Sequence, residues 1–216
     1  MNSKTKSFLI RLLIYILGLL ILALGVAFSI NSNLGVSPVS SLPYVISQIT
    51  GIEMGKCVIF IYSFFVMVQI LVLSKEFKWF NLAQILFATI FGYFVTFAQF
   101  ILGDFSIPTY IGQLIMLAIS IVLVAIGVYL YIGANMLHMP MEGMVAAIND
   151  KILKKYSFAD VKVIMDTTVV VIGIILSLVF LKKLVGIREG TVICALLVGK
   201  VMKLIQKVIG PKIKKL

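Results

Sequence analysis

The sequence predicts an all-α polytopic membrane protein with six transmembrane helices, arranged as an inverted 3+3 repeat with two short broken or re-entrant half-helices. Three observations support this fold class. Of the 216 residues, 62% are hydrophobic and only 12% are charged, and the mean hydropathy is +1.16, whereas soluble domains carry roughly 25% charged residues. Several apolar runs approach or exceed the length of about 20 residues that crosses a bilayer. The two halves of the chain also match one another.

The internal match is centred on a motif that occurs once in each half. The first copy is Asn33-Leu34-Gly35-Val36-Ser37-Pro38, and the altered second copy is Asn135-Met136-Leu137-His138-Met139-Pro140. A shift of 102 residues also places Gly25 on Gly127 and Ile46 on Ile148, and a shift of 107 places Gly92 on Gly199. Each half contains three predicted spans, an odd number, so the second half is expected to insert upside down relative to the first.

The first repeat, about residues 8–102, is predicted to contain three spans and one half-helix. The first apolar run, about 8–30, lacks a small-residue cleavage site and is therefore expected to be a transmembrane helix. Ser37 suits an N-cap and Pro38 a first helical position, which predicts a half-helix over about 38–50 that is too short to cross. Spans 2 and 3 are expected at about 54–73 and 81–102.

The second repeat, about residues 110–209, follows the same order. Its spans are expected at about 110–133, 158–181 and 187–209, its half-helix at about 140–153, and a basic tail at 210–216. Residues 1–216 are thus expected to form a single transmembrane domain. Most lysines and arginines fall on the side of the N-terminus if six spans alternate, which predicts that both termini are cytoplasmic. Lys182, Lys183 and Arg188 are exceptions in one outer loop.

Three short motifs resemble the bacterial YczE/YyaS/YitT group of integral membrane proteins. They are Asn33 to Pro38 after the first span, Thr50-Gly51-Ile52 followed by Gly55, and Gly186-Ile187-Arg188-Glu189-Gly190-Thr191-Val192 ahead of Gly199. The resemblance covers most of the chain and implies a transporter-like protein of the bacterial inner membrane, without indicating a substrate. Structural roles are expected for the glycines and prolines of the motifs and of the repeat, namely Gly35, Pro38, Pro140, Gly190 and Gly199.

The repeated motif also supplies candidate binding residues. Asn33 and Ser37 lie at a half-helix N-terminus, where backbone N–H groups and the helix dipole favour an anionic ligand; the alternative is a simple capped helix start. The second copy contributes Asn135, His138 and Glu142. Glu142 could bind a cation or a proton, or merely complement the dipole, and His138 could relay protons or be a surface histidine at the membrane edge.

Asp166 is the candidate with the strongest physical argument. It lies inside the predicted fifth span, where an unpaired carboxylate is energetically unfavourable. At 1.5 Å per residue it is about 12 Å from the inner end of that helix, and Lys200 is about 13 Å from the inner end of the next. Asp166 could therefore pair with Lys200. The alternative is that Lys162 pairs with Asp166, and that Lys200 extends towards anionic lipid.

Motifs for catalysis, metal binding and cofactors are absent from the sequence. No metalloprotease, nucleophile-elbow or phosphate-loop pattern occurs, and Cys57 and Cys194 do not form a Cys-x-x-Cys pair, so no enzyme, cofactor or metal site is expected. The net charge of +11 is spread over short loops and a tail, which suits anionic lipids of the inner leaflet and not nucleic acid.

Two functions from different classes follow from these observations. One is a small secondary transporter or facilitator for an unidentified small solute, with anions among the candidates. The other is a non-catalytic partner subunit or scaffold, for example the substrate-capture component of a larger transport complex. Either function is compatible with a homo-oligomer.

Overall fold

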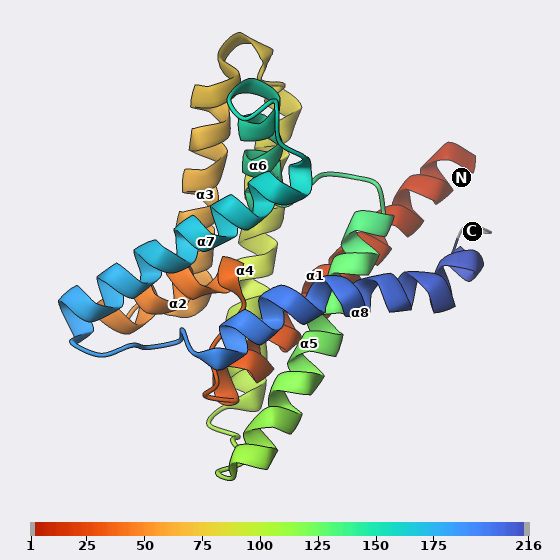
Figure 1. Cartoon of the computed structure of the whole chain (residues 1–216). Coiled ribbons are helices and arrows are strands. Elements are labelled where there is room, and N and C mark those ends of the chain that lie inside the picture. Colours follow the sequence, from red (N-terminus) through yellow and green to blue (C-terminus); the bar gives the residue numbers. More distant parts are fainter. Residues whose placement is uncertain (1–2, 214–216) are drawn as a thin grey trace.

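A computed structural model describes residues 3–213, and over this range the chain is all-helical (Figure 1). The long helices agree closely with the predicted spans, although α8 begins two residues later and continues to Ile213. The predicted tail beyond that residue lies outside the described part. The α-helices are α1 (Ser3–Asn31), α2 (Pro38–Thr50), α3 (Met54–Leu73), α4 (Ala83–Leu102), α5 (Tyr110–Gly133), α6 (Pro140–Lys151), α7 (Phe158–Leu176, followed by a π-helical turn, Ser177–Leu181) and α8 (Glu189–Ile213).

Within the described residues, five helices are long and apolar enough to cross a membrane. They correspond to α1, α3, α4, α5 and α7, over Thr5–Asn31, Met54–Glu76, Trp79–Leu102, Tyr110–Gly133 and Asp160–Leu181. The sixth predicted span, α8, is not among them. Its second half carries Lys200, Lys203 and Lys207, which lower its apolar character. The two predicted half-helices are present as α2 and α6.

The centre of the molecule is the contact between α1 and α5. These two helices approach closely because glycines face each other: a Cβ atom at Gly18 would lie 2.9 Å from the carbonyl oxygen of Gly127. Each central helix has one further long neighbour at its side, α4 against α1 and α8 against α5. The first and second halves of the chain therefore use equivalent neighbours around a common centre.

The two short helices are exchanged between the halves. Helix α2 packs against α7 as well as α3, and α6 packs against α3 as well as α7; in Figure 1, α2 lies beside α7, and α6 lies near one end of α3 and α4. The turns before the two helices share one feature, since Asn33 (φ 57°) and Asn135 (φ 53°) are both left-handed, but Gly35 (φ 108°) has no positive-φ counterpart at Leu137. The shifted sequence match thus corresponds to a matched conformation at the two asparagines.

Ser37 occupies the predicted N-cap position of α2, but its side chain does not cap the helix. It makes no hydrogen bond to a backbone N–H of the first turn, and its hydroxyl instead lies 3.1 Å from the Ser40 hydroxyl. The predicted capping role is therefore wrong. Pro38 alone provides the helix-start signal, through a fixed φ that suits the first helical residue.

The halves differ in how their last two long helices pack. Helices α3 and α4 are in close contact at Gly55 and Gly92, where neither residue has room for a side chain. Helices α7 and α8 have no comparable contact. A Cβ atom at Gly199, the residue that matches Gly92, would meet nothing within 4 Å, so Gly199 has no packing role in this conformation. Helix α7 is correspondingly exposed. Of its most apolar 18-residue stretch, 17% is buried, against 44% for α1 and α5.

Candidate functional site

Three charged side chains meet where the start of α6 contacts α7. The Lys162 ammonium lies 3.2 Å from Asp166 Oδ1 and 3.9 Å from Glu142 Oε1. The three side chains are largely shielded, with exposed fractions of 30% for Lys162, 22% for Asp166 and 18% for Glu142. One ammonium group is therefore shared by two carboxylates, and we call these residues the charged trio.

The trio corrects the predicted pairing of Asp166 with Lys200. Asp166 pairs with Lys162, one helical turn before it, which is the alternative that the sequence also allowed. Lys200 is exposed on α8 and forms no ion pair within the described residues. The physical reason is that α7 and α8 are not packed together, so equal depth along the two helices does not bring their side chains into contact.

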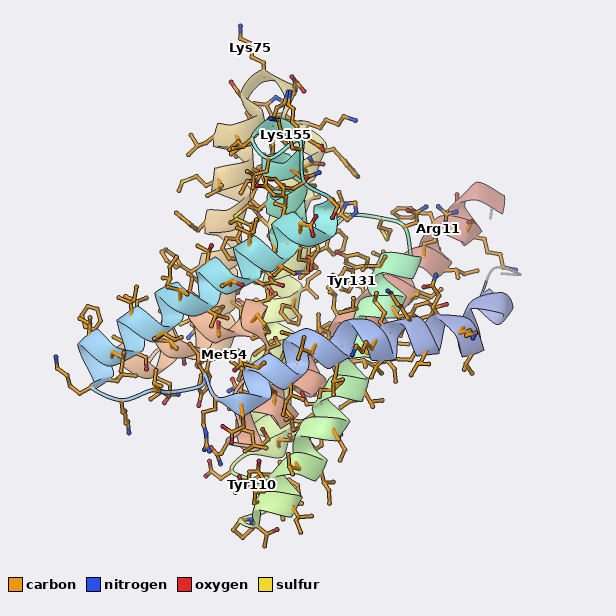
Figure 2. The ribbon with its side chains drawn as sticks, in the orientation of Figure 1. Arg11, Met54, Lys75, Tyr110, Tyr131 and Lys155 are labelled. Carbon is orange, nitrogen blue, oxygen red and sulfur yellow. The ribbon has the colours of Figure 1, made fainter. Side chains whose placement is uncertain are left out.

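Tyrosines from three other helices surround the trio. Tyr15, Tyr62 and Tyr131 are buried, and each phenol is within electrostatic reach of Glu142; Tyr131 is labelled near the end of α5 in Figure 2. The Tyr15 hydroxyl donates to the Leu137 carbonyl at 3.2 Å. Within the described residues, Glu142 Oε2 is buried without a hydrogen-bond partner. A buried oxygen of this kind can accept a proton or a cation.

A pair of buried glutamines fixes the start of α6. Gln69 Nε2 lies 3.0 Å from Gln84 Oε1, and it also donates to the Pro140 carbonyl at 3.1 Å. Gly143 has no room for a side chain because the Gln69 amide packs on it. Neither glutamine is among the predicted site residues, although two amides inside the apolar spans of neighbouring helices are a signal that the sequence contains. They hold Glu142 in position by anchoring the turn that carries it.

A second cluster forms where the loop before α2 contacts the loop before α8. Gly190 N donates to the Leu34 carbonyl at 2.7 Å, Val36 N donates to the Gly186 carbonyl at 2.9 Å, and Arg188 Nη1 donates to the Asn33 carbonyl at 2.9 Å. We call this contact the loop clasp. It joins two of the sequence motifs, which lie more than 150 positions apart in the chain.

Gly35 and Gly190 of the clasp have no room for a side chain. Gly35 has φ 108°, and a Cβ atom there would lie 2.6 Å from Thr191 Oγ1. A Cβ atom at Gly190 would lie 2.5 Å from the Leu34 carbonyl oxygen. Larger residues at either position would separate the loops.

A pocket of about 210 Å³ opens beside the clasp. It is lined by Ile30 at the end of α1, by the loop before α2, by Tyr44 of α2, and by residues 183–186 and Arg188; Asn33 contributes to it as a predicted candidate. Burial raises the pKa of Tyr44 above its usual value, so its hydroxyl keeps its proton at neutral pH. The remaining candidates of the second copy, Asn135 and His138, are exposed and do not join the trio.

A family of unknown function, DUF6198, matches residues 9–207. The chain belongs to this family. It is also 30% identical over 147 residues to the uncharacterized membrane protein YczE of Bacillus subtilis (strain 168), a match that covers 68% of this chain and 66%, just under two thirds, of that protein. The predicted resemblance to YczE-like membrane proteins is therefore confirmed. No solved structure matches the chain significantly.

Proposed function

We propose that this protein is a small secondary transporter or facilitator for a small solute, and that it carries out no enzymatic reaction. The main observation in support of this proposal is the charged trio of Glu142, Lys162 and Asp166. Ionisable side chains within a membrane span are unfavourable unless they serve a purpose, and they commonly mark substrate pathways, ion pathways and proton relays. Here they lie on α7, a candidate span, and on the short helix that packs against it.

The trio can couple a proton or a cation to a change in helix packing. Two carboxylates share one ammonium, so the group carries a net charge of −1 when all three residues are ionised. Binding one proton or one monovalent cation neutralises that charge. Because Glu142 is on α6 and its two partners are on α7, the attraction between these helices changes with occupancy.

The architecture that we propose is the inverted 3+3 repeat, with α8 as the sixth span and both termini cytoplasmic in the bacterial inner membrane. The exchanged half-helices and the paired left-handed asparagines support the repeat. In Figure 2, Lys75 and Lys155, which this topology places on the inner side, lie at the end of the molecule opposite Tyr110. Secondary transporters commonly use such repeats, with binding sites where the halves meet.

Transport is tested with the purified chain in liposomes. A thermal-shift screen of small anions, amino acids and cations selects the solute, since a ligand that binds the folded state raises its apparent stability. Uptake of that solute should follow a proton or cation gradient in the wild type and be abolished in Asp166→Asn. Wild-type uptake by the variant would refute the proposed role of the trio.

The proposed topology has its own test. Cysteines introduced in place of Ser3 and Ser106 should react with a membrane-impermeant reagent from opposite sides of the membrane. Reactivity of both positions from the same side would overturn the assignment of the spans.

The second candidate function, a partner subunit, is favoured by the exposed apolar surface of α7 and α8. Large exposed side chains there include Val171, Ile175, Leu196 and Leu204, and a partner helix as well as lipid could cover them. Gentle solubilisation and affinity purification distinguish the candidates. A subunit should copurify with a fixed partner in constant ratio and be inert alone in liposomes, whereas a transporter should work by itself.

A further inference from the structure

The pocket beside the loop clasp has the size and the chemistry of a site for a small ligand. Its volume of about 210 Å³ is below the range of roughly 300 to 1,000 Å³ that holds drug-sized molecules. Four segments build it: the end of α1 through Ile30, the loop before α2, α2 itself through Tyr44, and the loop before α8. Two backbone hydrogen bonds of the clasp hold these loops together.

The polar residues that line the pocket favour an anion. Lys183 and Arg188 are both among the lining residues, and no carboxylate is. Asn33 and Tyr44 add an amide and a hydroxyl. The Tyr44 ring is held in place because Gly186, with φ 71°, packs directly on it and has no room for a side chain. Residues with cationic and with neutral polar side chains therefore line one small volume.

Arg188 is held in a fixed position by its existing bonds. Its Nη1 donates to the Asn33 carbonyl at 2.9 Å, and its Nε and Nη2 donate to Glu189 at 3.3 and 3.1 Å. A guanidinium that forms a fork of this kind recognises planar oxyanions in the same way. Glu189 does not line the pocket and is itself exposed, so its carboxylate acts as an internal anion with which an incoming ligand would compete.

We propose that this pocket is a binding site for a small oxyanion, carrying a carboxylate, phosphate or sulfate group, held by Lys183, Arg188 and the hydroxyl of Tyr44. For its physiological role the inference rests on the proposed transport function, since it would make small anions the class of solute that is captured. Binding itself does not depend on transport. The site is distinct from the charged trio, because no residue of the trio lines it.

Isothermal titration of the purified full-length protein in detergent tests the proposal. The probes are sodium phosphate, sodium sulfate and sodium acetate, each measured against sodium chloride at constant ionic strength. A separate titration with phosphatidylglycerol in mixed micelles distinguishes a lipid headgroup from a free anion. Lys183→Gln removes one cation of the pocket, and Lys182→Gln removes the neighbouring lysine, which does not line the pocket, as the matched control.

At least one probe should bind saturably to the wild type. Affinity should fall by about fivefold in Lys183→Gln, rise by about threefold in Glu189→Gln, and change by less than about twofold in Lys182→Gln. The increase in Glu189→Gln is expected because the Arg188 guanidinium would lose the carboxylate that competes with the ligand. Binding of phosphatidylglycerol alone, with the same response to the variants, would identify the oxyanion as a lipid phosphate.

Two results would overturn the proposal: no saturable binding of any probe, or the same affinity in Lys183→Gln and Lys182→Gln. The test of transport is independent of the test of this site. Saturable binding without uptake in liposomes would leave the site in place and refute the transporter, whereas uptake without binding at Lys183 would refute the site and leave the transporter.

Discussion

Lys162 is the one ammonium shared by two shielded carboxylates, so its removal should be harmful. In Lys162→Met, Asp166 and Glu142 would lose their common counterion while remaining mostly shielded. We expect the free energy of unfolding to fall by about 1 to 3 kcal/mol, between the values typical of surface and fully buried pairs. Thermal unfolding in detergent, followed by circular dichroism, measures the change.

Two further variants make this prediction specific. Lys200→Met should leave stability unchanged, because Lys200 is exposed and unpaired within the described residues. The double variant Lys162→Met with Asp166→Asn should be more stable than Lys162→Met alone, since one of the two orphaned charges is gone. Equal destabilisation by Lys200→Met and Lys162→Met would show that the trio is not the stabilising arrangement.

Gly190 and Gly199 are a matched pair of glycines on α8 with opposite surroundings. Gly190→Ala would place a methyl group 2.5 Å from the Leu34 carbonyl oxygen and open the loop clasp, whereas a methyl group at Gly199 meets nothing within 4 Å. We expect Gly190→Ala to destabilise by about 1 to 3 kcal/mol and Gly199→Ala to be neutral or stabilising by up to about 1 kcal/mol. Melting temperatures of the two variants, measured side by side, test this; similar losses in both would contradict it.

The same residues show what the sequence could and could not predict at this scale. Asn33 and Asn135 could be matched because a left-handed residue before a proline-initiated helix leaves a local signature. The partner of Asp166 could not be chosen, because depth along a helix does not reveal which helices touch. Tyr44 and Lys183 were missed for a related reason: the pocket arises from a contact between distant loops, and neither residue carries a motif of its own.

At the scale of helices, the most distinctive feature is the exchange of α2 and α6 between the halves. It places Ser41 of α2 against Gly173 of α7, since a Cβ atom at Gly173 would lie 3.9 Å from Ser41 Oγ. The two positions are therefore in contact, as a disulfide between them requires. In a variant without Cys57 and Cys194, the pair Ser41→Cys and Gly173→Cys should crosslink when membranes are mildly oxidised.

Mass spectrometry of the peptides detects this crosslink. The control pair is Ser41→Cys with Gly199→Cys, which the structure does not bring together and which should remain reduced. A crosslink in the control, or none in the test pair, would mean that α2 does not pack on α7. The result bears directly on the inverted repeat, because the exchange is its main structural support.

The sequence predicted the helices themselves better than their packing. Helix bounds follow from local signals, such as Pro38 and Pro140 at the helix starts and the apolar length of each span. Contacts between helices depend on which faces meet, and apolar residues surround most of these helices on all sides. The structure has α3 close to α4 at Gly55 and Gly92, but α7 apart from α8 near Gly199. The sequence does not predict this difference, although Gly92 and Gly199 coincide in the repeat.

For the whole molecule, this difference between the halves predicts how the proposed transporter would move. Alternating access in inverted-repeat transporters is largely a rocking or gating of one repeat against the other, and we expect the two proposed repeats to exchange their packing in this way. The present structure has α3 packed on α4 and α7 apart from α8. The opposite state should then have α7 packed on α8 near Gly199, with α3 and α4 separated.

Distances between spin labels on exposed positions of these helices can detect the exchange. In liposomes, addition of the transported solute or a proton gradient should shorten the distance between labels at Val171 and Leu196, on α7 and α8, and lengthen that between labels at Phe60 and Tyr93, on α3 and α4. Labels at Leu13 and Ile132 should not respond, because α1 and α5 form the packed centre. Gly199→Ala should keep the stability of the wild type yet slow uptake, since its methyl group would obstruct only the state in which α8 closes on α7. Distances that stay fixed in all three pairs while uptake proceeds would exclude this movement.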